Sequence, residues 1–264
     1  MTPVRLGAVG YLNARPLVHG LEQHSRFTVR YDIPSRCAEL LHAGAIDVGL
    51  IPSIEYLRGS GYRIVPDLAI ASRGPVASVA LYTKRPMSDV RSIAMDTSSR
   101  TSVALASVLC ARLFRIRPAT EMRGPDLDDM LAHADAALII GDNALFLDGS
   151  PGSGQIDKID LGQEWTKMTG LPFVYAFWAG REGVLNGNDV RELQRARDEG
   201  VRRPDEIARE YFRDAPDRQT IGARYLRDNI KYVLEADEQA GLELFYRYAA
   251  EAGVVPASCA VRFY

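Results

Sequence analysis

The sequence has 264 residues, of which 47% are hydrophobic, and a formal net charge of −2 at pH 7. A chain of this length can bury a sizeable core and folds as one large domain or two of ordinary size. The small net charge argues against nucleic-acid binding, and the lack of a long apolar window argues against a membrane span.

Strand and helix patterns alternate through the first part of the chain. Apolar runs predict strands over 5–9, 27–33 and 47–52, and each is followed by a helical or turn pattern. Two β-rich runs, 63–71 and 76–82, flank a turn at Gly74-Pro75.

A second series of strands and helices follows Lys84. A strand ends near Met95 and is followed by a helix. The patterns then predict a helix over 126–133, a strand over 136–142, a Gly/Ser-rich surface loop over 148–154, and a β-rich run over 172–178. From Asn186 onward the pattern is helical almost to the end of the sequence.

This alternation predicts an α/β protein of two lobes. Breaks in the pattern near Lys84 and Trp178 place a second lobe, residues 84–178, inside a first lobe formed by residues 1–83 and 179–264. Each lobe is expected to hold a mixed, mainly parallel sheet flanked by helices.

The densest polar cluster is Asp96-Thr97-Ser98-Ser99-Arg100-Thr101-Ser102, which joins a predicted strand to a predicted helix. The first turn of a helix has unpaired N–H groups and the positive end of the helix dipole, so this junction favours a carboxylate. A helix cap needs one hydroxyl, whereas this cluster has five together with Arg100. We interpret the cluster as the floor of a small-molecule site.

Further polar residues lie where ligands of open α/β sheets bind, just beyond the carboxyl ends of strands. They are Asn13, Ser53 with Glu55, and Gly141-Asp142, and Ser78 lies in a run that could link the lobes. Each has a purely structural alternative, because Asn braces its own turn readily and Ser or Asp caps helices.

Several chemistries lack their sequence signals. There is no GxSxG elbow, no phosphate-binding glycine loop and no dinucleotide fingerprint. The four histidines do not follow strands, and the three cysteines form no CxxC pair, so we expect no metal site. Such a set of hydroxyls, amides and carboxylates is better suited to binding and orienting a ligand than to strong acid–base catalysis.

Three segments resemble the dehydratases of the futalosine pathway of menaquinone biosynthesis. They are Gly10-Tyr11-Leu12-Asn13, residues 47–56 (DVGLIPSIEY) and residues 96–102 (DTSSRTS). The match continues in order through GDNAL at 141–145, Trp165 and GLPFV at 170–174, and covers roughly residues 5–180. Gly10 departs from the family pattern, in which Ser is commoner, and this weakens a hydroxyl role there.

The resemblance implies a type II periplasmic-binding-protein fold kept in the cytoplasm, and the sequence shows no signal-peptide pattern at Met1–Leu6. It implies a hydro-lyase, chorismate dehydratase, which removes water from chorismate to give 3-[(1-carboxyvinyl)oxy]benzoate. It implies no cofactor and no nucleic-acid or membrane partner. The residues give no support for a particular oligomeric state.

The resemblance and the residue inventory together lead to a set of expected site residues. Asn13 and Ser78 are expected to be catalytic and to orient the ring and its departing hydroxyl. The expected substrate-binding residues are Tyr11, Ser53, Thr97, Ser98, Ser99, Arg100, Thr101, Gly141 and Asp142. The proton acceptor stays open among Glu55, Asp142 and a carboxylate of the substrate. Whether Trp165, Tyr175 and Trp178 line the cleft is also open, and burial tendency favours the core.

Two other functions fit the same fold. One is a non-catalytic solute-binding protein for small carboxylates, against which the missing signal-peptide pattern argues. The other is the sister enzyme of the pathway, 1,4-dihydroxy-6-naphthoate synthase, whose N-terminal loop has a different sequence.

Overall fold

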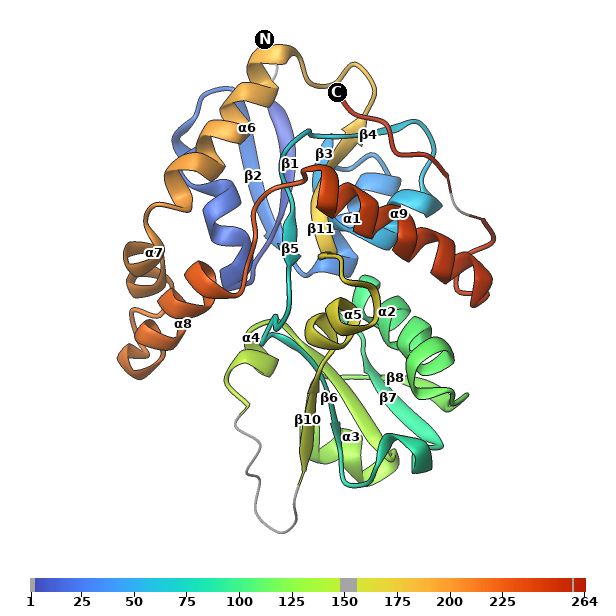
Figure 1. The fold of residues 1–264 in the computed structure, drawn as a ribbon. Helices are drawn as coiled ribbons and strands as arrows, with labels where there is room; N and C mark the ends of the chain where they lie inside the picture. Colours follow the sequence, from blue (N-terminus) through green and yellow to red (C-terminus); the bar gives the residue numbers. More distant parts are fainter. Residues whose placement is uncertain (1–2, 148–155, 258) are drawn as a thin grey trace.

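The computed structural model describes residues 3–147, 156–257 and 259–264, so the predicted surface loop at 148–154 lies outside the described residues. The chain forms two lobes, each built on one sheet, and the second lies below the first in Figure 1. We call the six-stranded sheet and its helices the first lobe, and the five-stranded sheet and its helices the second lobe.

The first lobe contains both ends of the described chain. Its sheet has the strand order β2-β1-β3-β11-β4, and β5 also pairs with β11. The strands are β1 (Val4–Val9), β2 (Phe27–Asp32), β3 (Val48–Pro52), β4 (Tyr62–Ile64), β5 (Ile70–Ser72) and β11 (Phe173–Arg181). Its helices are α1 (Pro34–His42), α6 (Gly187–Gly200), α7 (Pro204–Tyr211), α8 (Pro216–Asp228) and α9 (Ala236–Glu251), with short helical turns η1 (Leu12–Val18), η2 (Leu21–Gln23) and η3 (Ser53–Arg58).

The second lobe is formed by the middle of the chain. Its sheet has the order β10-β6-β9-β7-β8. The strands are β6 (Val79–Thr83), β7 (Ser92–Asp96), β8 (Ala119–Arg123), β9 (Ala136–Ile140) and β10 (Asp157–Asp160). The helices are α2 (Thr101–Leu109), α3 (Leu127–His133), α4 (Gly141–Leu145) and α5 (Leu161–Thr169), with the helical turns η4 (Met87–Asp89) and η5 (Cys110–Phe114).

Both sheets are mixed, as predicted, but parallel pairs do not predominate. The parallel pairs are β1 with β2 and β3, and β7 with β8 and β9. The strands β6 and β11 enter a sheet directly after the chain has passed between the lobes, and both pair antiparallel to their neighbours. Parallel neighbours are joined by a crossover connection within one sheet, whereas β6 and β11 each follow a strand of the other sheet.

The chain passes between the lobes a few residues before each predicted boundary. The strand β6 at 79–83 belongs to the five-stranded sheet, and β11 from residue 173 belongs to the six-stranded sheet. The predicted boundaries followed breaks in the sequence pattern, and those breaks come after the first strand of each new sheet. The passages themselves, 73–78 and 170–172, are too short to interrupt a β-rich run.

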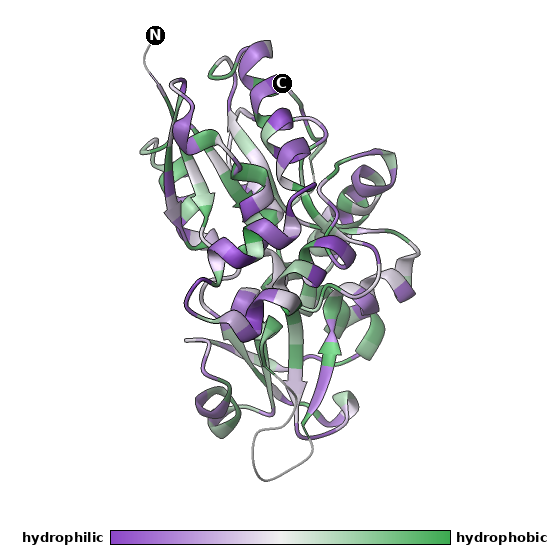
Figure 2. Ribbon diagram, turned by 90° about the vertical axis from the view of Figure 1, so that its left-hand side faces the viewer, coloured by the Kyte–Doolittle hydropathy of each residue, from purple (hydrophilic) through white to green (hydrophobic). Residues whose placement is uncertain are grey.

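Alternating side chains of the strands form cores on both faces of the second sheet. In β9, Leu138 packs in the large cluster that extends through both lobes, whereas Ala137 and Ile139 pack in a smaller cluster on the opposite face. Figure 2 shows the hydrophobic strands inside the lobes and hydrophilic residues on the outer helices. Trp165 and Trp178 are fully buried in the large cluster, which places both in the core. None of the helices in the described ranges is long and apolar enough to cross a membrane.

Candidate active site

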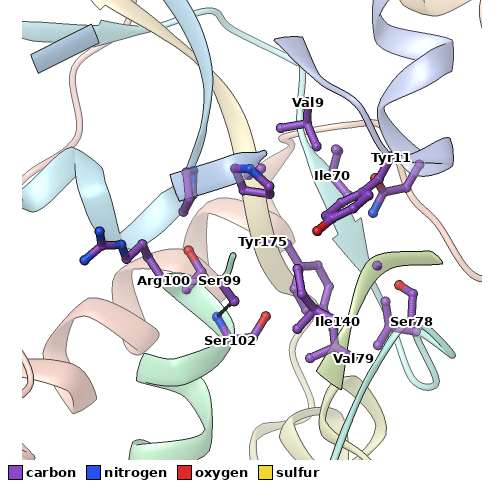
Figure 3. Close-up of a pocket in the computed structure, with 17 residues that line it drawn as sticks. Val9, Tyr11, Ile70, Ser78, Val79, Ser99, Arg100, Ser102, Ile140 and Tyr175 are labelled. Carbon is purple, nitrogen blue, oxygen red and sulfur yellow. Dashed lines mark hydrogen bonds between the residues drawn. The ribbon is translucent and has the colours of Figure 1, made fainter. Parts of the chain in front are cut away.

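A pocket of about 540 Å³, counted with its open mouth, lies between the lobes (Figure 3). The expected site residues that line it are Tyr11, Asn13, Ser78, Ser99, Arg100, Thr101 and Gly141. Ser53, Thr97, Ser98 and Asp142 do not line it.

The start of α2 forms one wall of the pocket. Asp96, the last residue of β7, is fully buried, and its Oδ1 accepts hydrogen bonds from the Ser98 N–H (2.9 Å) and the Ser98 hydroxyl (2.6 Å). Burial raises the pKa of Asp96, although both bonds from Ser98 oppose that shift. Asp96 therefore fixes the loop, and Ser98 is held behind the wall.

The hydroxyls and amides at this helix start are available to an anion. The Ser99 hydroxyl oxygen accepts a hydrogen bond from the Ser102 N–H (3.2 Å), which leaves the Ser99 hydroxyl hydrogen free to donate. Among the described residues, no hydrogen bond is made by the N–H groups of Arg100 and Thr101. Unpaired amides at the start of a helix bind carboxylates.

Thr101 and Ser53 use their hydroxyls to join the lobes. The Thr101 Oγ1 accepts a hydrogen bond from the Ile54 N–H (3.2 Å) and lies 3.4 Å from the Ser53 Oγ. Ser53 donates to the Val174 carbonyl (2.8 Å) and is fully buried. The structure thus places Ser53 behind the pocket, where its hydroxyl is already fully used.

Thr97 and Arg100 point away from the pocket. The Thr97 side chain is exposed, and its backbone N–H donates to the Arg123 carbonyl at the end of β8. The Arg100 guanidinium extends away from the Ser99 and Ser102 hydroxyls (Figure 3) and donates to Glu39 across the lobes (3.3 Å). Only the backbone and the near part of Arg100 are therefore placed to line the pocket.

Asn13 and Ser78 both line the pocket. The Asn13 Oδ1 is buried and has no hydrogen-bond partner among the described residues. Ser78 is 1% exposed, and its Oγ lies 2.7 Å from the hydroxyl of Tyr225 on α8. A buried amide oxygen without a partner is rare in proteins, which makes the Asn13 Oδ1 a candidate acceptor for a ligand.

Tyr11 and Gly141 meet between the lobes. The Tyr11 hydroxyl donates to the Ser98 Oγ (3.1 Å), and the Tyr11 ring lies against Gly141. Gly141 has a φ of +65°, which favours glycine, and a Cβ there would lie 2.9 Å from two ring carbons. The Tyr11 ring can therefore occupy this position only because residue 141 is a glycine.

Asp142 joins the lobes and leaves no carboxylate oxygen facing the pocket. Its Oδ1 accepts from the Leu12 N–H (3.2 Å), and its Oδ2 accepts from the Tyr211 hydroxyl (2.5 Å). Burial raises the pKa of Asp142, and the Tyr211 bond opposes that shift.

Glu55, the other candidate proton acceptor, also lies outside the pocket lining. Its carboxylate accepts from Arg58 (2.6 Å) and lies 3.0 Å from His42 Nε2. Neither carboxylate considered as the base is thus placed to reach a ligand in the pocket.

Most of the apolar lining was not among the residues predicted from the sequence. Val9, Pro52 and Ile140 end strands β1, β3 and β9, so the strand-end rule could have found them. Tyr175 also lines the pocket, and its hydroxyl lies 3.1 Å from the Ser72 Oγ. Ser102 belonged to the predicted cluster but was not singled out. Within the described residues, no group of three or more His, Cys, Asp and Glu side chains is placed to hold a metal ion.

Comparison with known proteins identifies the family. The family described as menaquinone biosynthesis matches residues 4–251. The chain belongs to this family. It is also similar to the chorismate dehydratase of Thermus thermophilus, with 32% identity over 260 residues that cover 93% of this chain and 94% of the relative. The menaquinone biosynthesis family predicted from the motifs is thereby confirmed.

Solved structures establish the fold of this family member. A protein from Archaeoglobus fulgidus has a TM-score of 0.77 and 17% identity, covering 96% of this chain and 98% of its own. The alkanesulfonate-binding protein SsuA from Xanthomonas axonopodis pv. citri, solved bound to MOPS, has a TM-score of 0.71 and 15% identity, covering 99% and 96%. At these identities the likeness concerns the fold alone. The predicted two-lobed, periplasmic-binding-protein-like α/β fold is confirmed.

Proposed function

We propose that the protein is a chorismate dehydratase, a hydro-lyase that converts chorismate to 3-[(1-carboxyvinyl)oxy]benzoate and water in menaquinone biosynthesis. Membership of the family and the name of the Thermus thermophilus relative support this activity. The observation that carries the proposal is the unpartnered Asn13 Oδ1, buried in the pocket between the lobes. Leaving such a group without a partner costs about 1–3 kcal/mol, which a ligand hydroxyl would recover.

One carboxylate of chorismate would bind at the start of α2. The free N–H groups of Arg100 and Thr101 and the hydroxyls of Ser99 and Ser102 supply donors there. The helix dipole adds to their attraction for a negative charge. The Arg100 guanidinium pairs with Glu39 instead, so its charge would act on the substrate only from a distance.

The elimination needs two groups placed at the ring. A proton leaves the ring carbon that bears the enolpyruvyl ether, the C–H electrons form the new ring double bond, and the C–O bond of the neighbouring hydroxyl breaks. The departing hydroxide takes up a proton, so water is the only other product. Asn13 would hold the ring hydroxyl through its Oδ1, and Ser78 would donate to the leaving oxygen. Aromatisation makes the step strongly downhill.

A carboxylate of the substrate itself is the proton acceptor that we propose. The carboxylates of Glu55 and Asp142 lie outside the pocket lining and already accept hydrogen bonds. The enolpyruvyl carboxylate is attached close to the ring carbon that loses the proton. Fixing one conformation of that group would give the proximity advantage of an intramolecular reaction.

Closure of the lobes would keep water out during the reaction. Several hydrogen bonds already join the lobes around the pocket, among them those of Tyr11 with Ser98, Ile54 with Thr101, and Leu12 with Asp142. We propose that the lobes are the two domains expected from the sequence, with the chain passing between them at 73–78 and 170–172. We also propose that the protein works in the cytoplasm.

The direct test is incubation of the purified protein with chorismate. We expect loss of the chorismate absorbance together with a product lighter by one water, identified by mass spectrometry. Chorismate that binds but stays unchanged would indicate a solute-binding protein. Chorismate that neither binds nor reacts would favour the sister enzyme 1,4-dihydroxy-6-naphthoate synthase, and either result would overturn the proposal.

A further inference from the structure

Tyr225 lies directly behind Ser78, one of the two residues that the proposed reaction depends on. It comes from α8, near the end of the chain, whereas Ser78 lies immediately before β6. The Tyr225 side chain is 2% exposed, and its hydroxyl oxygen lies 2.7 Å from the Ser78 Oγ. A fixed, buried phenol therefore holds the Ser78 hydroxyl at the pocket lining.

Either hydroxyl can be the donor in the bond between Tyr225 and Ser78. If Tyr225 donates its hydrogen to the Ser78 Oγ, Ser78 keeps its own hydroxyl hydrogen for the pocket.

We propose that Tyr225 is a positioning residue that donates to the Ser78 Oγ and so directs the Ser78 O–H into the pocket. The inference rests on the proposed function, because it assigns Ser78 a donating role toward the substrate. That role is fixed before the substrate binds, so little reorganisation is needed in the reaction.

The state of Tyr225 supports this role. Burial raises the pKa of Tyr225 well above the neutral range, and its hydrogen bond with Ser78 only partly opposes that shift. The phenol is therefore protonated and neutral at neutral pH. It can hold Ser78 but cannot serve as the base.

A nearby tyrosine provides a matched control. Tyr232 is 6% exposed, and its buried hydroxyl has no hydrogen-bond partner among the described residues. Tyr225→Phe and Tyr232→Phe remove the same atom from two buried rings of the same lobe. Only the first removes a contact to the pocket lining.

The test compares Tyr225→Phe, Ser78→Ala, their double variant and Tyr232→Phe by steady-state kinetics with chorismate. We expect Tyr225→Phe to lower kcat about 10–100-fold while KM changes less than about twofold, because orientation is lost and binding is kept. The loss in the double variant should be clearly smaller than the product of the two single losses, since the residues act through one contact. Tyr232→Phe should keep wild-type kcat, and thermal unfolding checks that all variants are folded.

Different failures have different meanings. Wild-type protein that does not turn over chorismate overturns the proposed function and this inference together. Wild-type turnover with an unimpaired Tyr225→Phe, or with losses that multiply in the double variant, overturns the positioning role alone. An equal loss in Tyr232→Phe would also overturn it, because the effect would then belong to the core and not to the contact with Ser78.

Discussion

Tyr11 of the first lobe and Gly141 of the second lobe are in such close contact that no side chain fits between them. A Cβ on Gly141 would lie 2.9 Å from the Cδ2 and Cε2 of Tyr11, and Gly141 has a φ of +65°. Both residues line the pocket, and Tyr11 also donates to Ser98 in the second lobe. The glycine therefore determines how closely the lobes can approach on this side.

Gly141→Ala is expected to hold the lobes apart. The new methyl group displaces the Tyr11 ring, and the left-handed backbone adds strain of about 1 kcal/mol. We expect kcat/KM for chorismate to fall more than about tenfold, mainly through KM, because the closed pocket is harder to form.

Gly170→Ala is the matched control for backbone strain. Gly170 has a φ of +75° and open space where a Cβ would lie. The two variants should lose similar stability in urea unfolding, whereas only Gly141→Ala should lose activity. Equal kinetic losses in both would show that strain, and not the contact with Tyr11, is responsible.

Asn13→Ala tests the group that carries the proposed function. We expect turnover to fall more than about tenfold, equivalent to more than about 1.4 kcal/mol in the activation barrier, while chorismate still binds. Turnover is followed by chorismate absorbance and binding by titration calorimetry. Asn143→Ala is the control, because Asn143 is exposed and does not line the pocket. Wild-type turnover in Asn13→Ala would remove Asn13 from the mechanism.

The sequence predicted the wall of the pocket better than the direction of each side chain. The hydroxyl-rich cluster at a strand-to-helix junction does lie at the pocket, because its position follows from the local pattern. Within it, Ser99 faces the pocket, Ser98 bonds to Asp96 and Thr97 is exposed. These directions depend on partners in other strands and in the opposite lobe, which the local pattern does not specify.

Contacts between distant segments were the least predictable part of the site. Tyr211 and Tyr225 lie on amphipathic helices near the end of the chain, where an aromatic residue at helical spacing indicates only a buried face. The structure places their hydroxyls against Asp142 and Ser78. Asp142 was predicted to line the pocket, but its carboxylate instead accepts a hydrogen bond from the Tyr211 hydroxyl.

Thr101→Val tests the contact between the lobes at the start of α2. Valine keeps the shape of threonine but cannot accept the hydrogen bond from the buried Ile54 N–H, now 3.2 Å from Thr101 Oγ1. We expect a loss of about 1–3 kcal/mol in the free energy of unfolding, measured in urea, because a buried donor is left without a partner.

Ser107→Ala is the control for Thr101→Val on the same helix. The Ser107 hydroxyl donates to the Val103 carbonyl within α2 (3.0 Å), so its removal leaves no buried donor without a partner. This change should cost less than about 0.5 kcal/mol. Equal effects of the two variants would contradict a role for Thr101 in joining the lobes.

The ion pair between Arg26 and Asp189 makes stability depend on pH. The Asp189 carboxylate accepts from Arg26 Nε (2.7 Å) and Nη2 (2.9 Å), and from the Asn186 N–H (3.0 Å) at the start of α6. The hydrogen bonds from Arg26 are the main cause that lowers the pKa of Asp189, and burial opposes them. The folded protein therefore binds a proton at Asp189 less readily than the unfolded chain does.

Asp189→Asn should be less stable than wild type at pH 7, because the charged pair is lost. A carboxyl whose pKa is lower in the folded state stabilises the protein above its unfolded pKa of about 3.9, and this stabilisation is lost as the pH falls through the folded pKa. The stability gap between the two proteins, measured by urea unfolding from pH 7 to pH 3, should therefore shrink below about pH 4. Asp198→Asn, which removes an exposed partner of Arg197, should show a small gap throughout. If the difference in stability between wild type and Asp189→Asn stays constant from pH 7 to pH 3, the lowered pKa of Asp189 is not the cause of that difference.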